Sequence, residues 1–166
     1  MTGGFETRIV SLISTEFLSI IRNETVWGMS KMKTETCLGI AGLMGATAVA
    51  AGAFGAHGLE GKIPDDLMEI FQTAAHYHLI HSVVLLALSA LIQQNQKSAI
   101  LSISAYFFSF GILVFAGSLY ILALSGTRWW GAVTPIGGVL LILGWTTLSY
   151  YCFRAGKSFA SRPNQS

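Results

Sequence analysis

Residues 37–56 read CLGIAGLMGATAVAAGAFGA, twenty consecutive residues without a charged side chain. An α-helix rises 1.5 Å per residue, so this stretch would be about 30 Å long, which is the hydrocarbon thickness of a bilayer. Small residues recur along one helical face: Ala41, Gly45, Ala48, Gly52 and Gly55. Because small faces let helices approach closely in lipid, we expect a membrane-spanning helix that is central in a helical bundle.

The composition of the whole chain agrees with a membrane protein. Apolar residues make up 52% of the 166 residues and charged residues only 11%, against about 25% charged in an ordinary soluble domain. The mean hydropathy is +0.59. The net charge is only +2, and the basic residues form no concentrated patch. Nucleic acid is therefore not an expected partner.

Three further apolar stretches predict spans at about residues 74–92, 99–124 and 132–153. The second helix should begin earlier, near Asp65, because proline followed by acidic residues is typical of a helix start. The fold class that follows is all-α: a polytopic membrane protein with a four-transmembrane-helix bundle over residues 36–157.

The two flanks of this domain differ from it. Residues 1–35 have apolar positions at helical spacing that charged residues interrupt, which predicts an amphipathic or poorly ordered extension. Met29 and Met32 stand just before the first span, and we hypothesise that residues 1–28 are dispensable or not translated natively. Residues 158–166 are predicted to be a disordered tail.

The distribution of lysine and arginine predicts an orientation. With four spans, eight of these residues fall on the side that carries both termini, and only Lys62 and Arg128 fall on the other side. Because basic residues accumulate in cytoplasmic segments, both termini should be cytoplasmic in an inner (plasma) membrane protein. The loop predicted at residues 57–64 then faces outward.

All four histidines lie after the first span or early in the second helix, at positions 57, 76, 78 and 81. His78 and His81 share a helical face, and a site that combines them with His57 is geometrically allowed. Such a site could ligate a metal or haem, relay protons or bind a small ligand. Alternatively, these histidines are interfacial side chains that bond backbone carbonyls. The candidate polar pocket comprises His57, His78, His81, Gln72, Thr73, Tyr77 and Thr134.

No other pattern in the sequence indicates a reaction. The two cysteines, Cys37 and Cys152, have no zinc spacing, no group of nucleophile and base is evident, and neither a metal nor a cofactor is assigned. Several glycines are instead expected at helix–helix contacts: Gly45, Gly52, Gly55, Gly111, Gly117, Gly137 and Gly138.

These motifs resemble the YgdD/YwdK-like family of small four-helix inner-membrane proteins, grouped as a domain of unknown function. The resemblance covers about residues 36–157 and rests on four stretches in order: GAFGAH at 52–57, FQT with YHLIH at 71–81, FAGSLY at 115–120 and VTPIGG at 133–138. It implies an inner-membrane location and four spans, and it implies no activity, substrate or cofactor. The extension before the first span departs from the family pattern.

Two classes of function follow from the sequence. The first is a non-enzymatic membrane component that acts as a scaffold or assembly factor through helix packing. The alternative is binding or translocation of a small molecule, a proton, or a metal or haem through the outward-facing pocket with histidines. The expected partners are the lipid bilayer and either a second copy of the chain or other membrane proteins.

Overall fold

A computed structural model describes residues 31–160 of the chain. The predictions for residues 1–30 and for residues 161–166 lie outside this range. Residues from Met32 onward form one compact unit, and the description below concerns that unit alone. Its last helix continues through Ala160, three residues into the predicted tail.

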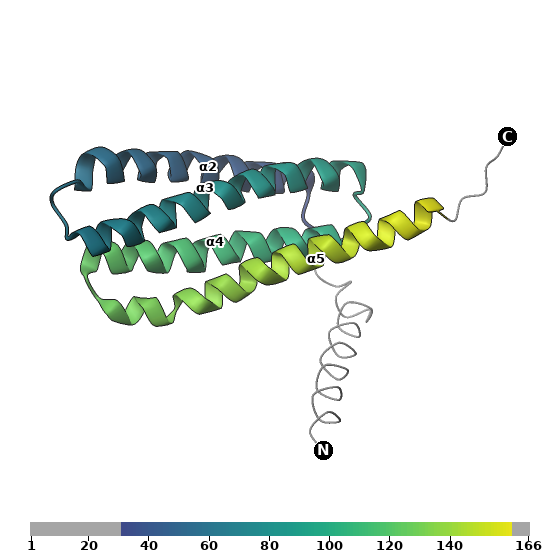
Figure 1. The fold of residues 1–166 in the computed structure, drawn as a ribbon. Coiled ribbons are helices and arrows are strands. Elements are labelled where there is room, and N and C mark those ends of the chain that lie inside the picture. Colours follow the sequence, from purple (N-terminus) through teal and green to yellow (C-terminus); the bar gives the residue numbers. More distant parts are fainter. Residues whose placement is uncertain (1–30, 161–166) are drawn as a thin grey trace, which may run out of the picture. The chain divides into compact units, whose positions relative to one another are not determined.

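Four long helices make up the unit (Figure 1): α2 (Thr34–Phe54), α3 (Asp65–Gln94), α4 (Ala99–Ser125) and α5 (Thr134–Ala160). Each is long and apolar enough to cross a membrane. The predicted fold class, an all-α polytopic membrane protein with a four-helix bundle, is confirmed.

Two short helical segments complete the backbone. A π-helical turn, η2 (Gly55–Leu59), extends α2, so His57 lies on a helical extension where the sequence predicted a loop. A 3-10 helix, η3 (Arg128–Ala132), joins α4 to α5.

The helix ends follow from local chemistry. The carbonyl oxygen of Pro64 accepts hydrogen bonds from the backbone N–H groups of Leu67 and Met68. Asp65 and Asp66 occupy the first turn of α3, where negative charge is favourable. Helix α4 ends at Gly126, whose φ of +68° is a left-handed conformation suited to glycine.

The α2–α3 connection contains η2, and the α4–α5 connection contains η3. Both lie at the same end of the bundle, which we call the His57 end (Figure 1). Arg128 in η3 forms an ion pair with Asp66 at the start of α3, with 3.0 Å between Nη2 and Oδ2. Both side chains are exposed, so this pair contributes little to the free energy of unfolding.

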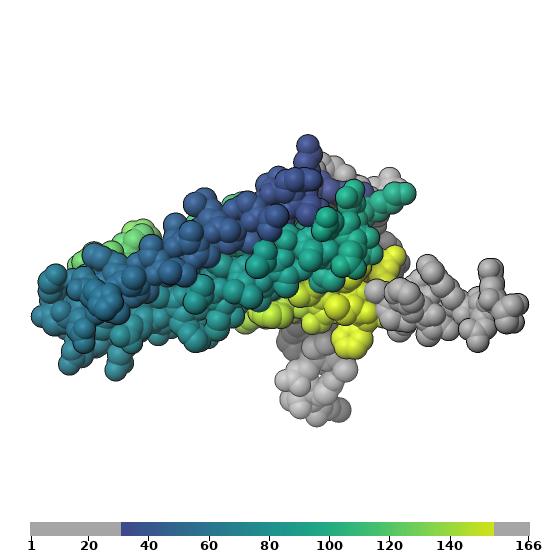
Figure 2. Space-filling model, turned by 90° about the horizontal axis from the view of Figure 1, so that it is seen from above, coloured from purple at the N-terminus to yellow at the C-terminus, as the bar shows by residue number. Residues whose placement is uncertain are grey.

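Packing is concentrated between consecutive helices: α2 on α3, α3 on α4, and α4 on α5, whereas α2 and α5 make little or no contact. Helix α4 is the most buried of the four and α2 the least. Figure 2 shows α2, in dark blue, at the surface along its length beside the teal α3. The expectation that α2 is central is therefore wrong, because its small residues lie on two faces and α3 covers only one.

The interior is a core of buried, mostly apolar side chains from all four helices. Leu85 of α3, Leu101 and Phe108 of α4, and Cys37 of α2 are all fully buried. Hydrogen bonds from buried side chains to backbone carbonyls of other helices join Cys37 Sγ to Leu85 (3.6 Å) and Ser104 Oγ to Gly144 (2.9 Å).

The outward surface carries large apolar side chains on every helix, such as Leu43, Phe110 and Ile142, each more than half exposed. An apolar surface of this extent suits lipid rather than water.

Candidate functional site

His81 is held by both of its ring nitrogens. Its Nδ1 lies 2.8 Å from the carbonyl oxygen of Tyr77, which can only accept, so Nδ1 carries the proton. The indole N–H of Trp145 then donates to Nε2 over 3.4 Å. The ring also contacts Phe108, with centroids 5.9 Å apart. This arrangement defines a neutral imidazole that ties α5 to α3.

His78, one turn away, is only half satisfied. Its side chain is 8% exposed, and Nδ1 lies 3.4 Å from the hydroxyl oxygen of Tyr120 on α4. Its Nε2 is buried without a hydrogen-bond partner among the described residues. Whichever tautomer is present, one ring nitrogen lacks a partner, and an unpaired buried nitrogen costs about 1–3 kcal/mol. Of the two buried histidines, His78 is therefore the one with a ring nitrogen available to bind a further group.

The other predicted pocket residues lie in separate places. His57 is exposed on η2, and its side chain has no hydrogen bond to another described residue. Thr73 donates to the carbonyl of Glu69 in its own helix. Tyr77 stacks on His81, while Thr134 Oγ1 lies 2.9 Å from Ser118 Oγ between α4 and α5.

Of these residues on α3, Tyr77 and His81 are thus in contact, whereas His78 contacts Tyr120 of α4, and His57 is not joined to them. Within residues 31–160, no three His, Cys, Asp or Glu side chains are grouped closely enough to hold a metal ion.

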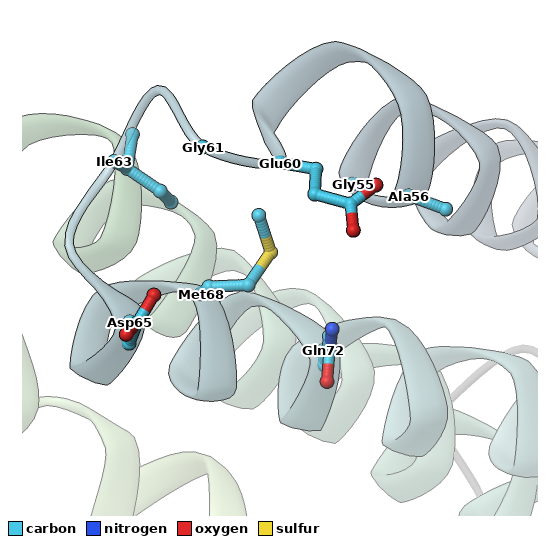
Figure 3. Close-up of a pocket in the computed structure, with 8 residues that line it drawn as sticks. All are labelled: Gly55, Ala56, Glu60, Gly61, Ile63, Asp65, Met68 and Gln72. Carbon is cyan, nitrogen blue, oxygen red and sulfur yellow. The ribbon is translucent and has the colours of Figure 1, made fainter.

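A pocket of about 300 Å³ opens at the His57 end between η2 and the first turns of α3 (Figure 3). Among the residues of the predicted polar pocket, only Gln72 lines it, together with the predicted packing residue Gly55. Its polar lining also includes the carboxylates of Glu60 and Asp65, and Met68 projects from α3 between Asp65 and Gln72 (Figure 3). Ala56 and Ile63 add apolar surface.

Sequence reasoning missed Glu60, Asp65 and Met68. The spacing of Asp65, Met68 and Gln72 along one face of the second helix was a usable signal. Glu60 lies next to the turn at Gly61, whose φ is +69°. The periodic spacing of residues along a helix does not predict such a turn.

The predicted packing glycines divide into three groups by the space around them. A Cβ at Gly55 would lie 3.0 Å from the ring of Phe71, one at Gly111 would lie 2.6 Å from Leu141, and one at Gly137 would overlap the backbone of Phe115. Gly45 and Gly138 are in ordinary contact, near Ser82 and Phe115. Gly52 and Gly117 face open space.

Gly144 was not among the predicted packing residues, although a Cβ there would lie 2.9 Å from the ring of Phe108. The close contacts cluster between α4 and α5, where glycine permits near approach of the two backbones.

The fold and these contacts define a small helical integral membrane protein. Residues 51–138 match the family model described as Protein of unknown function (DUF423). The chain belongs to this family.

Several curated relatives carry the name UPF0382. A UPF0382 membrane protein of Staphylococcus epidermidis is 46% identical over 101 residues, which cover 61% of this chain and 81% of the relative. YwdK of Bacillus subtilis is 41% identical over 98 residues (59% and 80%). The inner membrane protein YgdD of Escherichia coli is 38% identical over 117 residues (70% and 88%). No solved structure matches the chain. The resemblance to the YgdD/YwdK-like family is confirmed.

Proposed function

We propose that the protein is a non-enzymatic component of the inner membrane that assembles with a second copy of itself through the outward face of α2. The observation that carries this proposal is the spacing of Gly42, Ala46 and Ala50, three exposed small residues four positions apart. Small residues at this spacing are typical of helix–helix contacts in membranes.

On the outward face of α2, a line of small residues runs between two rows of large ones. At 100° per residue, Gly39, Ala46 and Ala53 lie along its centre, opposite the buried residues Cys37, Ala41 and Ala48. Large exposed side chains flank this line on both sides: Leu38 and Val49 on one, Leu43 and Phe54 on the other. We call this surface the α2 groove.

The outward face of α5 provides a contrast. It carries Ile136, Val139 and Ile142, each more than half exposed, which is the bulky surface expected against lipid tails. A groove of small residues instead permits another backbone to approach closely. Two copies related by a two-fold axis along the membrane normal would present the same groove to each other, as an isologous interface requires.

Disulfide cross-linking in membranes tests this proposal. Ala46→Cys, in a full-length chain whose exposed Cys152 is replaced by serine, should give a covalent dimer on mild oxidation. The matched control is Leu113→Cys, which is 53% exposed on α4 and should stay monomeric. Equal cross-linking at both positions, cross-linking at neither, or capture of a different protein at position 46 would contradict self-association through the α2 groove.

A second candidate function rests on His78 and its unpartnered Nε2. A small molecule, a proton, or a metal or haem group could bind at this nitrogen in the interior of the bundle. His78 Nδ1 already lies near Tyr120, and both nitrogens of His81 are in use. Of the two buried histidines, His78 would therefore be the one that contacts such a group.

The purified protein tests this alternative directly. An optical spectrum reports haem, elemental analysis reports metal, and imidazole ¹⁵N NMR reports the state of His78. A single sharp neutral tautomer of His78 at all pH values, with no bound group, would exclude the alternative.

A further inference from the structure

His78 has a buried ring nitrogen that no group in the described part of the chain satisfies. The side chain lies near the middle of α3 and is 8% exposed. Its Nδ1 lies 3.4 Å from the hydroxyl oxygen of Tyr120, whereas Nε2 has no hydrogen-bond partner among residues 31–160. Buried polar nitrogens in native proteins are normally hydrogen-bonded, so a further group is expected at Nε2.

The surroundings of His78 disfavour a charged group at Nε2. None of the segments 37–56, 70–92, 99–124 and 133–153 contains Asp, Glu, Lys or Arg. The nearest acidic residue on α3 is Glu69, nine positions away, which is about 13 Å along the helix axis and on the opposite face. The titratable side chain of α4 that contacts the ring is Tyr120. A proton or a metal ion at Nε2 would therefore place an unbalanced charge in the interior, which is strongly unfavourable.

The packing around His78 favours a small group. Tyr120 lies against the imidazole, with ring centroids 6.1 Å apart, and it also packs on Phe71 at 4.9 Å. The larger pocket at the His57 end is lined by other residues and does not include His78. A group at Nε2 is therefore enclosed by the bundle itself, where interiors are close-packed.

Helix α2 offers His78 no polar side chain. A Cβ at Gly55 would lie 3.0 Å from Phe71, and α2 and α3 run in opposite directions (Figure 1). Ala48, seven positions before Gly55, is therefore at the level of His78, seven positions after Phe71. Ala48 is 2% exposed, and its methyl group can neither donate nor accept a hydrogen bond.

Water fits a site of this charge and size, because it is small and neutral and both donates and accepts hydrogen bonds. If Nδ1 of His78 donates to Tyr120, a water molecule can donate to Nε2. If Tyr120 donates to Nδ1 instead, Nε2 can donate to the water. The remaining bonds of the water can go to helix carbonyl oxygens, each of which has a second lone pair. Buried waters are typically held by about three hydrogen bonds.

We propose that Nε2 of His78 binds a single water molecule inside the helical bundle, next to a neutral imidazole. The contact atom is the one assigned by the second candidate function, so the proposal rests on that function and specifies its ligand as water. The site is independent of assembly through the α2 groove.

Magic-angle-spinning NMR of the full-length protein, labelled with ¹⁵N-histidine in lipid bilayers, tests this site. Magnetisation transfer from water should reach the imidazole of His78, whose signals are assigned by their loss in His78→Phe. Its Nε2 should show the ¹⁵N shift of a hydrogen-bonded neutral ring between about pH 5 and pH 8. His81 is the control within the same molecule. Both of its nitrogens bond protein groups, so it should receive no such transfer.

Tyr120→Phe tests which group holds the water. This variant removes the hydroxyl group and keeps the imidazole, so transfer to His78 should persist. Unchanged His81 signals show that the bundle keeps its fold. Loss of the transfer with the His81 signals unchanged would assign the water to Tyr120 and overturn the proposal. If the His81 signals change, the measurement on the natural chain decides alone.

Water transfer to His78, together with a hydrogen-bonded Nε2, supports the proposal. An unbonded Nε2 without transfer would overturn both the proposal and the second candidate function. A metal or haem bound to Nε2, or an imidazolium in the same pH range, would overturn the proposal and leave the second candidate function standing.

Discussion

His78 and His81 lie one helical turn apart on α3 and differ in how their nitrogens are used. His81 donates through Nδ1 and accepts through Nε2, which makes it a structural tie between α3 and α5. His78 leaves Nε2 unpaired. Sequence spacing placed both residues on one face and combined them with His57 in one candidate pocket. It could not distinguish their roles, because the distinction depends on Trp145 and Tyr120, which come from helices far along the chain.

Truncation of His81 should destabilise the fold. His81→Ala removes its ring contacts with Phe108 and Trp145 and leaves the Trp145 indole N–H without its acceptor. We expect the free energy of unfolding to fall by about 2–4 kcal/mol, measured by SDS titration in mixed micelles. His57→Ala, at an exposed position, should change it by less than about 0.5 kcal/mol. Equal losses for the two variants would show that His81 is not the tie described above.

Gly137 should tolerate no side chain. A Cβ there would overlap the backbone of Phe115, so Gly137→Ala must push α5 away from α4. We expect a loss of about 2 kcal/mol or more in the free energy of unfolding, by the same SDS titration. The control is Gly117→Ala on α4, where nothing lies within 4 Å of the added Cβ. It should be neutral or stabilising by up to about 1 kcal/mol, because alanine is the better helix former. A tolerated Gly137→Ala would contradict the close approach of α4 and α5.

At the scale of the elements, the sequence predicted four long apolar helices and no strand. This succeeded because uncharged length alone distinguishes a membrane-spanning helix. The prediction failed on the place of α2. Small residues occur on both of its faces, so composition could not tell which face meets α3 and which is left uncovered.

The two faces of α2 should respond differently to the same substitution. Ala48 is 2% exposed against α3, so Ala48→Leu overpacks the contact and should cost about 1–3 kcal/mol of unfolding free energy. Ala46 is exposed in the α2 groove, so Ala46→Leu should change the stability of the monomer by less than about 0.5 kcal/mol. Both values come from SDS unfolding at a dilution where the chain is monomeric. A large loss with Ala46→Leu there would mean that the groove is already occupied within the chain.

At the scale of the whole molecule, the charge distribution predicts an orientation. In the sequence, eight lysine and arginine residues occur in the two terminal segments and the α3–α4 connection, and two occur in the connections at the His57 end. We therefore expect both termini in the cytoplasm and the His57 end facing outward.

Reporter fusions test this orientation. A cytoplasmic fluorescent reporter should be active at both termini, and a periplasmic phosphatase should be inactive at both. A cysteine at Glu60 should react with a membrane-impermeant maleimide added outside intact cells. Phosphatase activity at either terminus, or an unreactive Glu60→Cys, would reverse the assignment.

Joining of two copies of this chain through the α2 groove is tested most directly by subunit counting. The measurement is single-molecule photobleaching in bilayers at low protein density. The natural chain should bleach in two steps, and Ala46→Leu should bleach in one, while Leu113→Ala on α4 should still bleach in two. Two-step bleaching that persists in Ala46→Leu, or one-step bleaching of the natural chain at every density, would contradict the claim.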